Sequence, residues 1–252
     1  MPLIFVLAAA FFVTALLYAS VGFGGGSTYT ALLALSGLDY RILPLVALAC
    51  NIIVVAGGSL RFARAGITPW RGALTLTFLA APAAFIGGQI PIDRDTFFIL
   101  LGLSLVVTSL TMLIPINGDD ADNVPQPHAS AKAMPFVAAP LGLLAGIVGI
   151  GGGIFLAPLL HLTRWSNARA IAATASFFIL VNSLFGLAGQ LFKHGASAFG
   201  GAMVEALPLL IAVAIGGQIG SLMALRVLPL RWIRWLTAAL VMLVGIRVLL
   251  GI

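Results

Sequence analysis

The sequence predicts an all-α polytopic membrane protein with two inverted repeats, each a glycine-broken helical hairpin plus three transmembrane helices. Three observations predict this fold class. Long apolar runs separate the charged residues, a glycine-rich motif occurs twice in matching order, and one of the possible topologies places most basic residues on one side.

The composition excludes a soluble domain. Hydrophobic residues make up 61% of the 252 and charged residues only 8%, and the mean hydropathy is +1.16. A soluble domain carries about 25% charged residues. Stretches without Asp, Glu, Lys or Arg cover 1–38, 42–60, 72–92, 96–118, 133–163, 170–192 and 206–225. Most of them reach the roughly 20 residues that a helix needs to cross a bilayer. They lack the alternation of membrane barrel strands, which leaves helices.

An internal repeat divides the chain. Gly-Phe-Gly-Gly-Gly at 22–26 returns as Gly-Ile-Gly-Gly-Gly at 149–153, and Ile-Gly-Gly-Gln-Ile at 86–90 returns at 215–219. Two matches in the same order at similar separations indicate a duplication. The only long polar stretch, at 115–134, reads as a surface linker. We therefore predict a first transmembrane repeat at 1–114, the linker, and a second repeat at 135–252.

We expect three full spans in each half, at about 42–60, 72–90 and 96–114 and at about 170–192, 202–224 and 232–250.

A glycine-broken segment precedes the spans of each half, at about 3–36 and 135–162. The arm from Pro135 to Val148 reaches roughly 20 Å at 1.5 Å per residue, which is too short to cross a bilayer alone. The second segment is therefore predicted to be two half-helices that meet inside the membrane. The first segment has a longer first arm, so a full span stays open there as an alternative to a re-entrant hairpin.

The basic residues favour opposite orientations for the halves. If every segment crosses once, five basic residues face seven, which is no bias. If each broken segment returns to the side from which it entered, only Arg41, Arg94 and Lys193 oppose nine others, with Arg247 near the outer end of the last span. The nine are Arg61, Arg64, Arg71, Lys132, Arg164, Arg169, Arg226, Arg231 and Arg234. The positive-inside rule then favours inverted repeats with both termini outside.

The glycine clusters are the first candidate site. One alternative is that small residues only allow helices to pack closely. Three adjacent glycines nevertheless weaken a helix interior by about 1 kcal/mol each, and a break at membrane depth needs burial in protein or a cavity. Ser27 and Ile154 would begin the second half-helices, whose free N–H groups and positive dipole ends attract anions. We expect a substrate site at Gly24, Gly25, Gly26, Ser27, Gly151, Gly152, Gly153 and Ile154.

Polar residues inside the predicted spans extend this site. An amide that lies in a membrane core is costly to leave unpaired and offers donors to an anion, which favours Asn51 and Asn182. Gln89 and Gln218 occupy equivalent repeat positions, where helix packing is the alternative role. Interhelical hydrogen bonding is likewise the alternative for single hydroxyls. We add Asn51, Thr174, Ser176, Asn182, Gln89 and Gln218 to the expected substrate site.

The sequence lacks the motifs that would indicate an enzyme, a metal site or a nucleotide-binding protein. There is no His-Glu-x-x-His, no cysteine pair and no nucleophile elbow, so we expect neither catalysis, nor a metal, nor a cofactor. Cys50 is the only cysteine. The net charge of +6 comes from scattered single residues, so we expect no nucleic-acid partner. A nucleotide-binding loop would need a βαβ context that 22–27 lacks. The spans also hold no evident acidic or histidine relay for proton coupling.

At these residues the sequence resembles the sulfite exporter TauE/SafE family. The resemblance rests on the motifs at 22–27 and 149–158, on 170–176 and 182–186, and on the repeated Gly-Gly-Gln, and it spans nearly the whole chain. It implies export of sulfite, sulfoacetate or a similar organosulfonate across a bacterial inner membrane. The first half has Ala-Leu-Ala-Cys-Asn at 47–51 where the second has Ala-Thr-Ala-Ser, so the two half-sites differ chemically.

Three functions stay open at this point. The first is an exporter of a small anion that works by alternating access around the two breaks. The second is an anion channel through the same pore, or an exporter of another small carboxylate or oxyanion. The third is a membrane scaffold without transport. The sequence leaves the anion, the energy coupling and the oligomeric state undetermined.

Overall fold

The computed structural model describes residues 2–20, 22–113, 134–163, 165–223 and 230–251, and in these ranges all regular structure is helical. The predicted linker at 115–134 lies almost wholly outside the described residues. The helices are α1 (Pro2–Ala19), α2 (Gly26–Leu35), α3 (Leu43–Arg64), α4 (Trp70–Gln89), α5 (Arg94–Leu113), α6 (Met134–Val148), α7 (Gly153–Leu162), α8 (Ala168–Glu205), α9 (Leu207–Met223) and α10 (Leu230–Leu250). The all-α prediction is confirmed for the described residues.

Both predicted helix breaks are confirmed. α1 ends at Ala19 and α2 begins at Gly26, while α6 ends at Val148 and α7 begins at Gly153. Each second arm thus starts one residue earlier than predicted. Gly25 and Gly152 precede the second arms with φ of 86° and 76°, in the left-handed region that side chains rarely adopt. Glycine at these two positions lets the chain turn sharply between the arms.

Several helices are long and apolar enough to cross a bilayer. Among the described residues they are Leu43–Arg64, Trp70–Gln89, Arg94–Thr111 and Ala168–Gly195. Large apolar side chains point outward from them and their neighbours, including Phe78 at 77%, Phe136 at 74% and Phe192 at 79% exposed. So much outward apolar surface fits a lipid environment and would not suit water. The chain is a multi-pass membrane protein.

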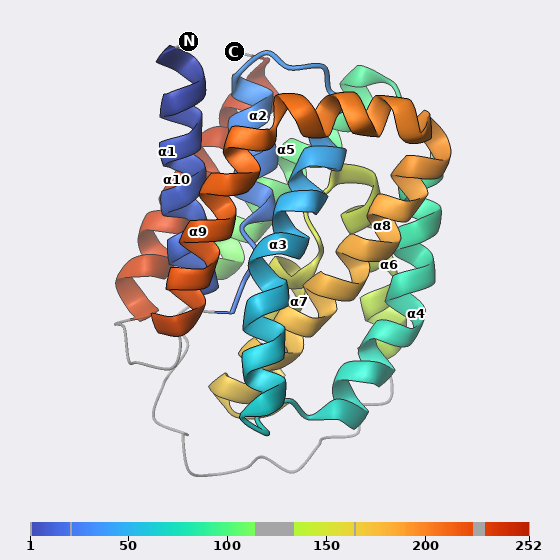
Figure 1. Cartoon of the computed structure of the whole chain (residues 1–252). Helices are drawn as coiled ribbons and strands as arrows, with labels where there is room; N and C mark the ends of the chain where they lie inside the picture. The colour runs from blue at the N-terminus through green and yellow to red at the C-terminus, as the bar shows by residue number, and fades with distance from the viewer. Residues whose placement is uncertain (1, 21, 114–133, 164, 224–229, 252) are drawn as a thin grey trace.

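The predicted span at 202–224 begins too early. α8 leaves helical geometry at Gly195, where φ is 80°. The following piece, Phe199–Glu205, is bent by 69° from α9, which begins at Leu207. Figure 1 shows this piece running across one end of the bundle. Hydropathy alone missed the bend because the piece is nearly as apolar as a span.

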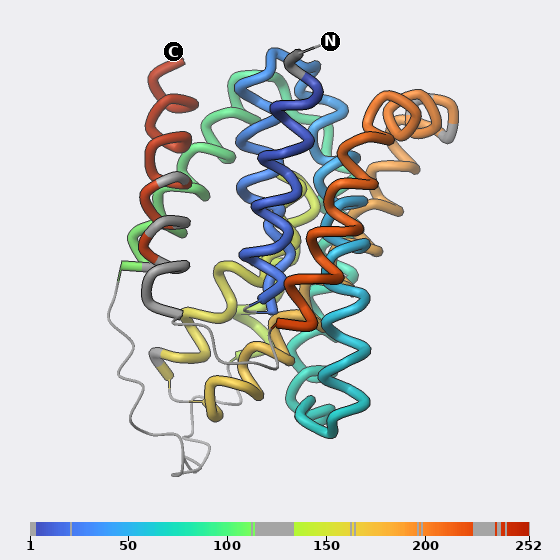
Figure 2. Tube along the Cα trace, turned by 60° about the vertical axis from the view of Figure 1, so that its left-hand side comes forward, coloured from blue at the N-terminus to red at the C-terminus, as the bar shows by residue number. Residues whose placement is uncertain are grey.

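The packing of the helices has a matched pattern. α1 packs against α9 as α6 packs against α4, and α3 lies against α8 while α5 lies against α10. α2 contacts α3 and α10, and α7 contacts α8 and α5 in the same way. Figures 1 and 2 show α1 beginning and α10 ending at one end of the bundle, whereas the turn between α3 and α4 lies at the other. We refer to the first as the terminal end and to the second as the opposite end.

Glycines bring the first arms close to their partner helices. A Cβ on Gly142 or Gly146 of α6 would collide with the backbone carbonyl of Ala80 or Ala84 on α4. On the other side of the molecule, Gly216 and Gly220 of α9 meet the carbonyls of α1 in the same manner. In lipid the hydrophobic effect does not drive helices together, so close van der Waals contact between backbones stabilises their association instead.

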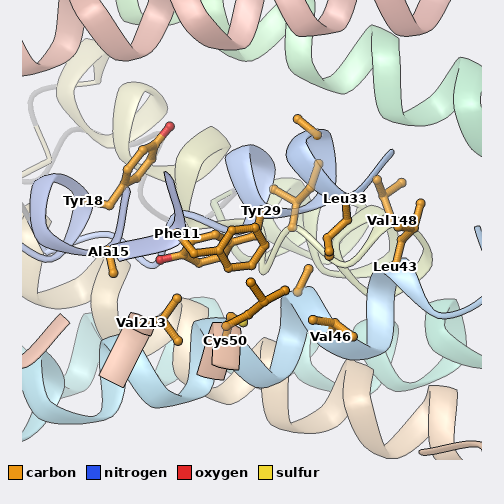
Figure 3. Close-up of a cluster of buried hydrophobic side chains, with 14 of the residues drawn as sticks. Phe11, Ala15, Tyr18, Tyr29, Leu33, Leu43, Val46, Cys50, Val148 and Val213 are labelled. Atoms are coloured by element: carbon orange, nitrogen blue, oxygen red, sulfur yellow. The ribbon is translucent and has the colours of Figure 1, made fainter. Parts of the chain in front are cut away.

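One apolar core cluster joins both halves. Figure 3 shows Phe11, Tyr29 and Cys50 close together, with Val148 and Val213 among the side chains around them. The rings of Phe11 and Tyr29 stack with centroids 4.8 Å apart. Since these side chains come from α1, α2, α3, α6 and α9, the cluster holds the first two helices against helices from the second half of the chain.

Because α4 and α6 lie so close together, we predict that one added methyl group between them destabilises the protein. Gly142→Ala should lower the free energy of unfolding by about 1–3 kcal/mol, because the new Cβ forces two backbones apart. Gly200→Ala is the control, since a Cβ there meets no atom within 4 Å. Denaturant unfolding in detergent followed by circular dichroism measures both. Equal stability of the two variants would contradict the packing described.

Candidate functional site

The two helix breaks meet at one side chain, Asn51 of α3. A Cβ on Gly24 would collide with Oδ1 of Asn51, and a Cβ on Gly26 would collide with its Nδ2. From the other break, a Cβ on Gly151 would lie 2.9 Å from the same Nδ2. The Asn51 amide is therefore wedged between the first and the second break. Asn51 is fully buried.

The glycines of the breaks are required by this crowding. Gly26 also approaches the carbonyl of Ile150, since its Cβ would lie 2.7 Å from that oxygen. Gly153 lies against Ile179 of α8, and a Cβ on Gly151, where φ is 80°, would lie 3.0 Å from the hydroxyl of Ser183. The breaks thus touch each other and the two long helices α3 and α8.

Buried polar atoms without a protein partner gather in these elements. Among the described residues, the side-chain polar atoms of Ser27, Asn51, Thr174, Asn182 and Ser183 make no hydrogen bond, and all five residues are at most 1% exposed. Leaving such an atom unpaired costs about 1–3 kcal/mol. Of these five residues, Asn51 and Ser183 contact the glycines of the breaks, Ser27 follows the first break, and Thr174 and Asn182 lie on α8.

The electrostatics of this region favour negative charge without a fixed cation. α2 and α7 each have ten residues and begin at the breaks, so their first N–H groups are free of helical partners and lie at the positive ends of the helix dipoles. Ser27 and Ile154 follow the helix starts and are buried. In the part of the chain that the structure describes, no cluster of His, Cys, Asp and Glu could hold a metal ion.

Other expected site residues make contacts of their own. The hydroxyl of Ser176 lies 3.0 Å from that of Ser59, so this pair links α8 to α3. Gly25 is crowded by Tyr29 and Thr14, and Gly152 by Ala145, Phe178 and a backbone carbonyl of α6. These two glycines shape the turns and face away from Asn51.

The structure does not bring the two repeated glutamines together at Asn51. Gln218 accepts a hydrogen bond of 2.7 Å from Nη2 of Arg61, and Nη1 of Arg61 donates to Ser221. Gln89 donates to the carbonyl of Phe85 in its own helix, at 3.3 Å. Equivalent sequence positions therefore have different partners in the two halves.

Two further residues lie at the site, and a third, Gln190, is a buried amide two helical turns away on α8. Ile179 forms an apolar wall against Gly24, Gly151 and Gly153, and Ser183 adds a hydroxyl. Gln190 is fully buried and donates from Nε2 to the carbonyl of Gly146 at 2.9 Å, while its Oε1 has no partner among the described residues. Gln190 lies in the uncharged run that ends at 192, so the rule that selected Asn182 also selects it.

A helical bundle with two interrupted helices around buried, unpaired polar groups is typical of membrane transport proteins. The family model of the sulfite exporter TauE/SafE family matches residues 6–248. The chain therefore belongs to this family.

The relatives of this chain are also named as membrane transporters. The probable membrane transporter protein y4hK of Sinorhizobium fredii is 36% identical over 249 residues, covering 96% of this chain and 97% of that protein. YunE of Bacillus subtilis, also named a probable membrane transporter, is 22% identical over 80% of this chain and 81% of its own. MamO of Paramagnetospirillum magneticum is 26% identical over 84% of this chain but only 39% of its own length. No solved structure matches the chain. Family and relatives indicate a transporter and not an enzyme.

The crowding at Asn51 predicts a difference between two glycines with similar φ. Gly151 has φ of 80° and Gly37 has φ of 76°. Alanine should cost about 1–2 kcal/mol of stability at either position because of the positive φ. Gly151→Ala should cost a further 1–3 kcal/mol or so by overpacking against Asn51, Ile179 and Ser183, whereas a Cβ on Gly37 meets no atom within 4 Å. Unfolding in detergent compares them, and equal losses would contradict the convergence of the breaks.

Proposed function

We propose that the protein exports a small sulfur-containing anion, such as sulfite, sulfoacetate or a similar organosulfonate, by alternating access around the two breaks. The observation that carries this proposal is the buried, unpaired amide of Asn51 held between Gly24, Gly26 and Gly151. The description of the family supplies the sulfur-containing class of substrate.

The chemistry of the site supports an anion. Amide Nδ2 of Asn51 and the hydroxyls of Ser27, Thr174 and Ser183 are donors without protein partners. The N–H groups at the starts of α2 and α7 add donors and partial positive charge. A site without a fixed cation binds an anion weakly enough to release it, as transport requires.

We further propose that residues 1–114 and 135–252 are inverted repeats joined by the linker at 115–134. The matched packing of α1 on α9 and α6 on α4 supports this, as does the location of both chain ends at the terminal end. With the positive-inside rule, the terminal end faces the outside of a bacterial inner membrane. The opposite end, which carries Arg61 and Arg64 at the end of α3, then faces the cytoplasm.

Alternating access needs contacts that can close one end at a time. Arg61 of α3 donates to Gln218 and Ser221 of α9, and Ser59 pairs with Ser176 of α8. These hydrogen bonds join the two proposed repeats between Asn51 and the opposite end. We assign them as the contacts that open when the site faces that end.

Transport in proteoliposomes tests the proposal. Wild-type protein should carry sulfite with saturable flux that rises when sulfite is present on the other side. Absence of flux for any sulfite, sulfonate or carboxylate above that of empty vesicles would overturn it. Large single-channel currents would overturn alternating access in favour of a channel.

Filling the second break should abolish transport. Gly152→Leu places a branched side chain at a left-handed position already crowded by Ala145 and Phe178, so the break cannot keep its geometry. The variant is expected to insert into the membrane and to transport no sulfite. Gly37→Leu is the matched control, since Gly37 has φ of 76° but open space around it. Unchanged transport by the Gly152 variant would favour a scaffold.

Removal of the Asn51 amide should weaken binding more than folding. Asn51→Ala removes two buried atoms that lack partners, and this gain offsets the cost of the small cavity left behind, so stability should hold. The lost donor should raise the half-saturation of sulfite flux by about tenfold, the effect of one hydrogen bond to a charged group. Ser104→Ala is the comparison, because Ser104 donates to the carbonyl of Leu100 within α5, apart from the breaks, and should leave half-saturation unchanged. Equal half-saturation in wild type and the Asn51 variant would remove Asn51 from the site.

A further inference from the structure

A cavity lies at the terminal end of the bundle, apart from the central site. It has a volume of about 280 Å³ and is lined by residues of the α2–α3 loop, α3, the α4–α5 loop, α5, α6 and α8. Its polar lining consists of Tyr40, Arg41, Gln190, Lys193 and His194, and its apolar lining of Pro44, Pro91, Ile92, Phe97 and Ile147. We call this cavity the vestibule.

The vestibule concentrates positive charge in a chain that has little. Arg41 and Lys193 both line it, and His194 lies beside Lys193. Nε of Arg41 lies 3.5 Å from the hydroxyl of Tyr40. That hydrogen bond raises the pKa of the Arg41 guanidinium above its usual range, so Arg41 stays charged. Two acids lie beside lining residues in the sequence but outside the lining itself: Asp39, which accepts from the backbone N–H of Arg41, and Asp93, which follows Ile92.

Each polar group of the vestibule is held or left available in a specific way. Nζ of Lys193 donates to the carbonyl of Ile90 at 3.3 Å, which fixes the ammonium beside the end of α4. Gln190 is fully buried and fixed through Nε2 to Gly146, with Oε1 unpaired. Nε2 of His194 is a buried atom that also lacks a protein partner in the described part of the chain. A charged group fixed by a hydrogen bond, beside buried polar atoms without protein partners, is the arrangement of a ligand-binding site.

The vestibule lies directly in line with the central site. On α3, Asn51 follows Pro44 of the vestibule by seven residues, and on α8, Ser183 precedes Gln190 by seven. Seven residues are two helical turns, so each pair shares one helix face about 10 Å apart. Leu48 and Gly186 lie between, and a Cβ on Gly186 would be 3.5 Å from Cδ1 of Leu48. One layer of apolar packing therefore separates the two sites.

We propose that the vestibule is a second anion-binding site on the transport path, and that it takes a small organic anion by its charged head. The head would lie at Arg41 and Lys193, and a short carbon chain would lie against Phe97 and Ile147. This inference rests on the proposed function, and it deepens it by adding a second, charged site between the terminal end and the central site. A positive mouth also raises the local concentration of anions.

Thiol labelling tests the vestibule without any need for transport. The one native cysteine, Cys50, is fully buried, so Ile92→Cys provides a single reporter in the lining. The probes are the anionic reagent 2-sulfonatoethyl methanethiosulfonate and its cationic trimethylammonioethyl counterpart. Their rates on the purified full chain are divided by their rates on a free thiol. The corrected ratio should favour the anionic reagent by about tenfold, and ethanesulfonate should slow its reaction.

Charge variants supply the control. Arg41→Gln with Lys193→Gln should lower the ratio to about one, whereas Arg94→Gln should leave it unchanged, since Arg94 lies near the same end but outside the lining. If the double variant fails to fold, Gln190→Glu tests the same point. A carboxylate at position 190 has nearly the size of the glutamine amide and should lower the labelling ratio of the anionic to the cationic reagent. A ratio near one in the wild-type background, or an equal effect of Arg94→Gln, overturns the vestibule.

The outcomes separate the two proposals. Expected labelling without any flux in vesicles keeps the vestibule and overturns the proposed export. Saturable flux with a labelling ratio near one keeps export and overturns the vestibule.

Discussion

The structure depends on interrupting two helices at membrane depth, where water cannot complete the backbone hydrogen bonds. Such a break is stable only when protein surrounds it or when it lines a polar cavity. Here each break packs against α3 and α8, and both press on the amide of Asn51. The polar groups at Asn51 and the packing around them therefore depend on each other. The bundle encloses the breaks, and the breaks leave backbone N–H donors inside the bundle.

This constraint explains where glycine is needed elsewhere. The two short arms, α2 and α7, begin inside the protein. The first arms, α1 and α6, lie very close to α9 and α4 respectively. Glycines at 142, 146, 216 and 220 permit backbone contact at those crossings. Both long helices that face the centre, α3 and α8, then supply its polar side chains. The same helices extend to the terminal end, where they line the vestibule with Pro44, Gln190 and Lys193.

The sequence was sufficient for the breaks and the all-helical class, because three adjacent glycines between two apolar segments disfavour an unbroken helix. It also selected Asn51, since an amide in a long uncharged run is costly without a role. It could not place Gln89 and Gln218, because repeat equivalence does not fix which neighbour a side chain meets. Arg61 is 157 residues from Gln218, and only the folded arrangement brings them together. The bend after Gly195 was missed because an apolar helix across the bundle end and a membrane span have similar hydropathy.

The most direct test of the central site is the position of a bound anion. Selenite is a heavier analogue of sulfite, and its selenium gives an anomalous signal in crystals of the full chain. We predict a peak within hydrogen-bonding distance of Asn51 Nδ2, between Gly24, Gly26 and Gly151. Saturating selenite that gives peaks only elsewhere, with Asn51 still unpaired, would contradict the account.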